Sequence, residues 1–224
     1  ANLITIMEQR HLYKKYPTKI TELDRKLYSE ISIIWKTDEI KRTKPSPLDE
    51  ARWGLAVIED SLWDTIPKVY TRLNDIFKKN LNKNLPRNFN PIQFGSWMGG
   101  DRDGNPNVTA EVTKKVILFS RWQAAKLYEK ELTQLIQDLS MEECSSEIRR
   151  VTGKSFEPYR VYLRPLRDKV RNTHQLIEAH INLKKPLDEK KLLQNKYEIL
   201  NPLREVRSSL SQNKGKHIAN AGLL

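Results

Sequence analysis

The sequence of 224 residues predicts a mainly α-helical fold interrupted by one short β-strand. Apolar residues recur with helical spacing along most of the chain, and helix start and stop signals flank several of these stretches. A short aromatic stretch flanked by proline and glycine has instead the composition of a strand, over residues 92–98. No linker divides the chain, so residues 1–224 are expected to form one segment. We expect helical structure over residues 20–81, the strand and a glycine-rich loop over 92–108, and helical structure over 109–213.

The first half of the chain carries two clear helix signals. One apolar helical face consists of Ile20, Leu23, Leu27, Ile31 and Ile34. A second helix should begin at Ser46, because this N-cap serine is followed by proline at the first helical position and then by two acidic residues. We expect Pro67 to break or kink that helix, since proline lacks an N–H and its ring clashes with the preceding turn.

The second half of the chain predicts four more helices. They are expected over residues 109–139, up to Gly153, over residues 158–183 and over residues 201–215. Glycine commonly ends a helix because it adopts positive φ angles without strain. Proline opens two of these helices, where its fixed φ suits the first turn, and Pro165 should bend the third.

The composition indicates a water-soluble chain with excess positive charge. Forty Lys and Arg residues against 28 Asp and Glu residues give a net charge of +12, and the mean hydropathy is −0.68. This imbalance favours either an anionic partner or simply a lysine-rich surface. No run of about 18 apolar residues occurs, so we expect no membrane span. The single cysteine, Cys144, excludes an intrachain disulfide and fits a reducing compartment.

Four arginines fall on one face of the expected helix over residues 158–183, namely Arg160, Arg164, Arg167 and Arg171. This arginine stripe would either bind phosphates or pair with acidic residues of a larger protein or a neighbouring subunit. Nucleic-acid binding is not favoured, because no homeodomain, zinc-finger or RNA-recognition pattern accompanies the stripe. His174 and His180 are six residues apart, which is the wrong interval for a paired metal site on one helical face.

The most informative segment is residues 94–109, which read FGSWMGGDRDGNPNVT. Three glycines in six positions allow positive φ angles and close backbone approach. Two carboxylates flank Arg102 and would either aim its guanidinium at an anion or turn toward a metal. A calcium loop is excluded, because Pro106 stands where the turn glycine belongs. The residues alone leave a hydrogen-bonded structural turn and an active-site loop equally open.

This segment resembles a signature of phosphoenolpyruvate carboxylases. Two further segments resemble the same family in the same order: WKTDEI at residues 35–40 followed by PSPLDEA at 45–51, and EPYR at 157–160. The resemblance runs from about Ile31 to the C-terminus. It implies a large, mainly helical, cytoplasmic enzyme built round an eight-stranded β/α barrel, usually a homotetramer. The chain would then be a mainly helical segment of that barrel enzyme with one or two short barrel strands, best placed at residues 92–98.

The resemblance also implies an activity. Such enzymes add bicarbonate to phosphoenolpyruvate with Mg²⁺ or Mn²⁺ and form oxaloacetate and phosphate, a carbon-fixing lyase reaction that feeds the tricarboxylic acid cycle. Trp97 matches the motif tryptophan that helps wall the pocket for carboxyphosphate and CO₂, and its alternative is a core tryptophan. Asp101, Arg102 and Asp103 match the same motif and would support the site, with a purely structural ion-pair turn as the alternative.

The main catalytic motifs of the family have no counterpart in this sequence. None of the four histidines precedes a proline, so the family's His-Pro-Thr-Glu motif is missing. The metal-binding carboxylates, the catalytic lysine and the arginine-glycine phosphate loop belong to the later part of such enzymes. We therefore expect no catalytic residue and no metal ligand here, and an inactive isolated segment. The competing hypothesis is a non-catalytic, basic helical binding module.

Overall fold

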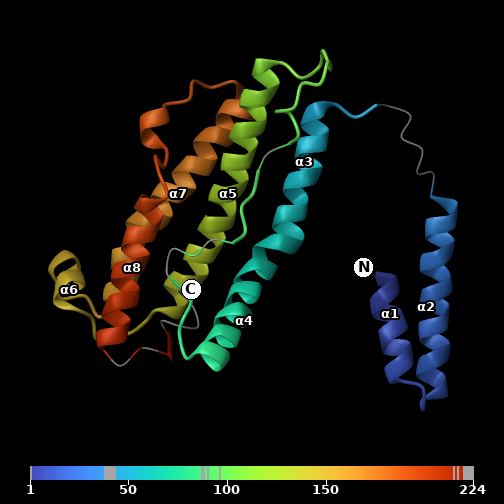
Figure 1. The fold of residues 1–224 in the computed structure, drawn as a ribbon, viewed down its shortest axis with the longest axis horizontal. Helices are drawn as coiled ribbons and strands as arrows, with labels where there is room; N and C mark the ends of the chain where they lie inside the picture. The colour runs from blue at the N-terminus through green and yellow to red at the C-terminus, as the bar shows by residue number, and fades with distance from the viewer. Residues whose placement is uncertain are drawn as a thin grey trace. The chain divides into compact units, whose positions relative to one another are not determined.

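The computed structural model describes residues 2–37, 44–86, 89, 91–95, 97–213, 215 and 217–218. It divides the chain into two compact units, Ala1–Lys44 and Pro45–Leu224, which are described separately (Figure 1). None of the helices in these ranges combines the length and the apolar character that a membrane span requires.

The first unit is a pair of contacting helices, α1 (Asn2–Leu12) and α2 (Pro17–Lys36). Helix α2 begins earlier than its apolar pattern suggests, because Pro17 occupies the first turn, where a missing N–H costs nothing. The guanidinium of Arg10 lies 2.5 Å from the Asp24 carboxylate and joins the two helices. Among the described residues of this unit, Leu23 alone is buried.

The second unit opens with α3 (Pro47–Val57), a π-helical turn (Ile58–Leu62) and α4 (Trp63–Leu81). Ser46 caps α3 as predicted, in a reciprocal capping box with Asp49. Of the two outcomes expected at Pro67, a break or a kink, the break is wrong, because this proline lies inside α4. The hydrogen-bond pattern changes upstream, at the π-helical turn, where the Trp63 N–H donates to the Ile58 carbonyl.

The remaining helices are α5 (Ala110–Asp138), α6 (Ser146–Thr152), α7 (Pro158–Leu183), a short 3₁₀ turn (Glu189–Lys191) and α8 (Tyr197–Gln212). Helix α5 starts next to Thr109 and Gly153 ends α6 with a φ of +63°, both as predicted, and the Thr109 side chain also caps α5. Helix α8 begins before the predicted residue 201. The side chain of Asn195 accepts a hydrogen bond from the Tyr197 N–H at 2.9 Å and supports this earlier start.

The core of the second unit lies where α5, α7 and α8 meet (Figure 1). Its buried members are Ala125, Leu132, Ile136, Leu139, Ile148, Tyr159, Leu163, Leu166, Val170, Ile199, Val206 and Leu210. The Tyr159 hydroxyl is 2.8 Å from the Ser209 hydroxyl, which in turn accepts the Ser145 N–H at 2.7 Å. This buried hydroxyl pair links α7, α8 and the cap of α6, so the hydroxyls of Tyr159 and Ser209 are both hydrogen-bonded.

The strand predicted at residues 92–98 is absent, and that prediction is wrong for the residues described there. Residues 91–95 and Trp97 have no regular secondary structure, residues 98–100 form a turn, and Ser96 lies outside the described residues. A strand is stable only beside a neighbouring strand, and no strand occurs anywhere in the described ranges. As far as the structure describes it, the segment is all-helical, without the barrel strands that the resemblance implied.

Candidate functional site

The candidate site is the loop over residues 97–108, named here the signature loop, which leads into α5. Its first turn closes directly after Trp97, whose carbonyl accepts the Gly100 and Asp101 N–H groups at 3.1 and 3.2 Å. Gly99 lies inside this turn with a φ of +72°, which side-chain-bearing residues rarely adopt. Trp97 is therefore the first residue of a tight backbone turn that its own carbonyl helps to close.

A second turn carries the loop into α5. The Asn105 N–H donates to the Arg102 carbonyl at 2.5 Å, and the Val108 N–H donates to the Asn105 carbonyl at 3.1 Å. Val108 is buried, and the Thr109 hydroxyl then accepts the Val112 N–H at 3.3 Å. The loop is thus fixed by its own backbone and by the cap of the following helix.

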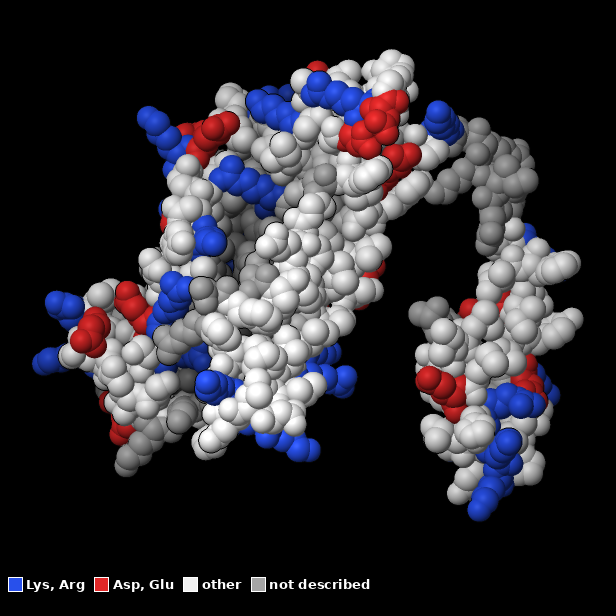
Figure 2. All heavy atoms as spheres, viewed as in Figure 1, with Lys and Arg blue, Asp and Glu red and all other residues white. Residues whose placement is uncertain are grey.

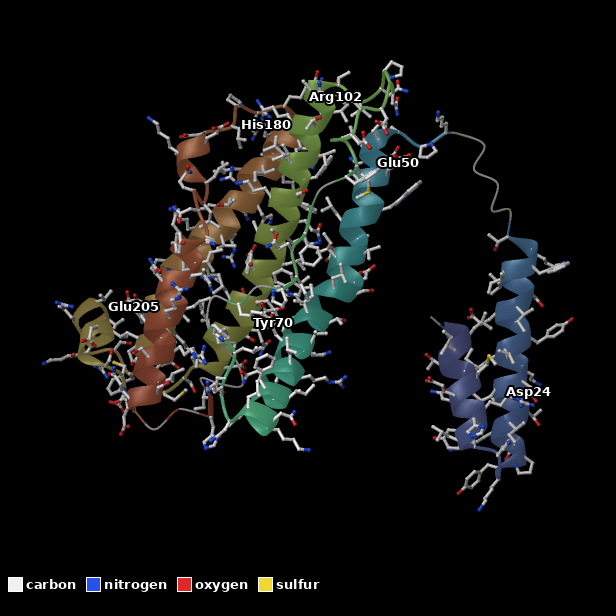
Figure 3. The ribbon with its side chains drawn as sticks, in the orientation of Figure 1. Asp24, Glu50, Tyr70, Arg102, His180 and Glu205 are labelled. Atoms are coloured by element: carbon white, nitrogen blue, oxygen red, sulfur yellow. The ribbon has the colours of Figure 1, made fainter. Side chains whose placement is uncertain are left out.

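The three charged residues of the motif stay apart from one another. Asp101 is half-buried, while Arg102 and Asp103 are exposed. Neither carboxylate forms an ion pair with Arg102, and no hydrogen bond joins the three side chains to a described residue. Figure 3 shows Arg102 at the end of the unit where α3 and α5 begin, on the same end as Glu50. The ion-pair turn considered from the sequence is therefore not observed.

Trp97 is not a core residue of this segment. Its side chain is 73% exposed, whereas the core residue Tyr159 is fully buried. Among the other tryptophans, the Trp63 indole donates to Glu131 at 3.2 Å and stacks edge-on with Tyr128. An exposed indole on a fixed turn is free to contact a ligand or another part of a larger protein.

The arginine stripe is largely used within the chain. Arg160 donates to the carbonyls of Ile136 and Gln137 at 2.8 and 2.6 Å, at the end of α5. Arg171 lies 2.5 Å from the Glu129 carboxylate on α5. A third member, Arg167, pairs with its neighbour Asp168 at 2.7 Å. Arg160 also pairs with Glu157, so three of the four guanidinium groups of the stripe have acidic partners within this chain.

The described residues include no group of three or more His, Cys, Asp or Glu side chains that could hold a metal ion. His180 Nδ1 lies 2.7 Å from the Lys185 carbonyl, and His174 Nδ1 lies 2.8 Å from a carboxylate oxygen of Glu129. These histidines therefore contact the helical framework. The residues that the structure describes therefore do not form a site that fits Mg²⁺.

A cavity of about 400 Å³ opens between α3, α5 and α7, and none of its lining residues belongs to the signature loop. Its two cationic side chains have partners nearby. Lys126 lies 3.6 Å from Glu59, and the Arg52 guanidinium lies over the Phe119 ring at 4.9 Å.

Figure 2 shows a largely uncharged band over α3 and α4, in contrast to the basic groups elsewhere on this face.

Sequence reasoning missed the contacts that hold the signature loop to the helices. The Thr113 hydroxyl donates to the Gly99 carbonyl at 2.6 Å. Met98 packs over Gly54, where an added Cβ atom would lie 2.2 Å from the Met98 Cε atom. The sequence signal for the Met98 contact was Gly54. A glycine inside a helix lowers helix stability by about 1 kcal/mol relative to alanine, so its presence there indicates close packing against another residue.

Together the fold and the loop define a helical segment that presents an exposed aromatic and charged turn at one end. More particularly, the chain belongs to the phosphoenolpyruvate carboxylase family, because the family model described as Phosphoenolpyruvate carboxylase matches residues 1–224. The resemblance drawn from the motifs is thereby confirmed.

Similar proteins agree with this assignment. The chain is 43% identical over 200 residues to a phosphoenolpyruvate carboxylase of Acinetobacter baumannii, covering 88% of this chain and 22% of that protein. It is 42% identical over 219 residues to one of Hahella chejuensis, covering 97% of this chain and 24% of that protein. A Klebsiella pneumoniae relative is 42% identical over 205 residues, with 91% and 23% covered. The chain thus spans about a quarter of the length of these relatives.

Proposed function

We propose that this chain is an internal segment of a phosphoenolpyruvate carboxylase, which forms oxaloacetate and phosphate from phosphoenolpyruvate and bicarbonate. The observation that carries the proposal is the family match over the whole chain, together with its coverage of about a quarter of the relatives. The whole enzyme is proposed to be a cytoplasmic homotetramer that requires Mg²⁺ or Mn²⁺. The metal ligands are proposed to lie outside this segment, since no fitting group occurs among its described residues.

Trp97 is proposed to wall the pocket in which carboxyphosphate and CO₂ are handled. Both carboxyphosphate and the enolate are lost if water or stray protons reach them, so an apolar wall protects the second half of the reaction. A tryptophan side chain contributes a contact area of roughly 150–250 Å². The 73% exposure of Trp97 supports this role, because the indole has most of its surface free for contacts beyond the core of this segment.

The charged residues of the loop are proposed to support the same pocket. The Arg102 guanidinium is planar and permanently charged, so it can bind two oxygens of a phosphate or carboxylate at once. It is exposed and has no ion pair with Asp101 or Asp103, which leaves its donors for an anion. The two carboxylates limit the local positive charge and so weaken non-specific anion binding.

The test is Trp97→Ala in the full-length enzyme that carries this segment. Oxaloacetate formation should fall by about ten- to a thousandfold, on the order of 1.4 to 4 kcal/mol of transition-state stabilisation. The pyruvate share of the product should rise at the same time, since more enolate is protonated before it captures CO₂. Pyruvate and oxaloacetate are measured together, alongside a thermal melt.

Phe156→Ala is the matched control, because Phe156 is also an exposed aromatic residue (78%) but precedes α7, far from the loop along the chain. It should leave the product ratio unchanged. Trp97→Phe should give an intermediate ratio, as it keeps part of the aromatic surface. An unchanged ratio in Trp97→Ala, with a large loss of thermal stability, would show that Trp97 has a packing role instead.

The isolated segment is proposed to be inactive, since it carries no counterpart of the family's proton-handling histidine or phosphate loop. A coupled assay with phosphoenolpyruvate, bicarbonate and Mg²⁺ should show no oxaloacetate above a buffer blank. Turnover by the 224-residue chain would contradict this proposal directly.

A further inference from the structure

The signature loop is bound to α5 through a single side-chain hydrogen bond. The Thr113 hydroxyl lies 2.6 Å from the Gly99 carbonyl and 3.2 Å from the Thr109 carbonyl of its own helix. The shorter bond reaches out of α5 to the loop, two residues after Trp97. Thr113 therefore contacts the backbone of the turn that carries the indole, without being part of the motif.

The same turn lies closely against the side of α5. A Cβ atom added at Gly99 would lie 2.5 Å from Val116 Cγ2 and 3.2 Å from Val116 Cβ, and the φ of +72° also disfavours a side chain there. Thr113 and Val116 are three residues apart and share one face of α5. One face of α5 thus both donates a hydrogen bond to the turn and packs closely against it.

Helix α3 holds the turn from the other side. Met98 occupies the space that a side chain at position 54 would take, since an added Cβ on Gly54 would lie 2.6 Å from the Met98 sulfur. Helices α3 and α5 contact each other directly. Met98 therefore packs against α3 and Gly99 packs against α5, while the adjoining Trp97 side chain remains exposed.

We propose that Thr113 is a positioning residue that sets the orientation of Trp97, an inference that rests on the proposed function of that tryptophan. The Trp97 carbonyl is held by the Gly100 and Asp101 N–H groups, and the Gly99 carbonyl is held by Thr113. Because the indole is mostly exposed, the turn rather than core packing determines where it points. Loss of the Thr113 hydroxyl releases the turn from α5 and lets the indole move.

The test compares Thr113→Val, which keeps the side-chain shape, with Thr113→Ser, which keeps the hydroxyl, in the full-length enzyme. Thr133→Val is the matched control, because the Thr133 hydroxyl lies on the same helix and donates to its Glu129 carbonyl at 2.7 Å. Two quantities are measured: the pyruvate share of the product, and amide hydrogen exchange in the peptide over residues 98–108. Thr113→Val should speed exchange in this peptide by about tenfold, because loss of the bond to the Gly99 carbonyl loosens the turn that protects the Gly100 and Asp101 N–H groups.

Thr113→Val is expected to show faster exchange and a higher pyruvate share than the wild type. Thr113→Ser and Thr133→Val are expected to behave like the wild type in both measurements. Gly99→Ala should cause the same pair of changes, since it lifts the turn away from Val116. Unchanged exchange in Thr113→Val would overturn the proposal, whatever the products are.

The product ratio separates this proposal from the proposed function. If Trp97→Ala raises the pyruvate share but Thr113→Val speeds exchange without raising it, the bond holds the loop without positioning the indole, and the proposal is wrong. If Trp97→Ala itself leaves the share unchanged, the pocket-wall function fails, and the positioning role is overturned with it. In that case faster exchange in Thr113→Val identifies a purely structural contact.

Discussion

The α1–α2 pair and the α5–α7 pair are both contacting helices, yet they bury very different amounts of side chain. Helices α5 and α7 contribute residues such as Leu132, Leu163 and Val170 to a core in which the last two are fully buried. In the first unit Leu23 is the buried residue among those described, while Ile31 and Ile34 are each 49% exposed. The same apolar spacing in the sequence therefore led to helices in both places and to a core in only one.

The difference teaches that helical periodicity identifies a face but not the partner that covers it. In water, an isolated helix pair gains stability in proportion to the apolar area it removes from solvent. The second unit reaches that area by adding residues of α8 and Ile148 of α6 to the α5–α7 pair. The apolar end of α2 has no such cover within its own unit.

Leu163→Ala tests this comparison with the largest expected effect. Leu163 is fully buried in the core, so the substitution should lower the free energy of unfolding by about 2–5 kcal/mol through lost burial and a residual cavity. Ile34→Ala removes a similar side chain from the half-exposed face of α2 and should cost less than about 1 kcal/mol. Urea unfolding of both variants gives the two values, and equal losses would contradict the comparison.

Arg160→Met should have a smaller effect on the second unit. Arg160 donates to the Ile136 and Gln137 carbonyls at the end of α5, so its loss leaves two acceptors to water and should cost about 1–2 kcal/mol. Arg164→Met, at an exposed neighbouring position on α7, is the matched control and should be nearly neutral. The melting temperatures of the two variants report the difference. Equal melting temperatures would show that the hydrogen bonds from Arg160 to the end of α5 do not stabilise the unit.

Tyr162→Phe tests the packing of α7 against α8 in the second unit and has the smallest expected effect. The effect is a change in how the free energy of unfolding depends on pH. Glu205 lies on α8 (Figure 3). Burial, and then the hydrogen bond to Glu205, raise the pKa of Tyr162 to about 12. Since the pKa is raised in the folded state, the stabilising contribution is complete below the usual value near 10 and is lost as the pH rises through 12. The wild-type free energy of unfolding should therefore fall more between pH 9.5 and 11.5 than that of Tyr162→Phe. Parallel curves would show that the contact is absent in solution.

Most helices could be predicted from the sequence because their signals are local. The N-cap at Ser46, the helix start near Thr109 and the helix end at Gly153 each depend on a few neighbouring residues, and the structure confirms them. The strand at residues 92–98 could not be judged in this way, since a strand depends on neighbours elsewhere in the chain. The break expected at Pro67 does not occur, because the proline lies inside α4, and the π-helical turn lies upstream, at residues 58–62.

The candidate site was foreseen only in part. The motif identified the loop, and the structure adds that Trp97 is exposed and that Asp101, Arg102 and Asp103 do not pair with one another. Their roles in a substrate pocket stay predictions. The anchoring contact from Thr113 could not be read from the sequence, because it depends on how the loop folds back along α5.

The core helices α5, α6, α7 and α8 follow one another along the chain, and this order bears on how the unit folds. Each packs against the next or the next but one, so the loops that must close before the core forms are short. Folding rates rise as contacting residues come closer in sequence, and helical domains of this kind fold in microseconds to milliseconds. During synthesis, all the residues of this core are therefore available once α8 has left the ribosome.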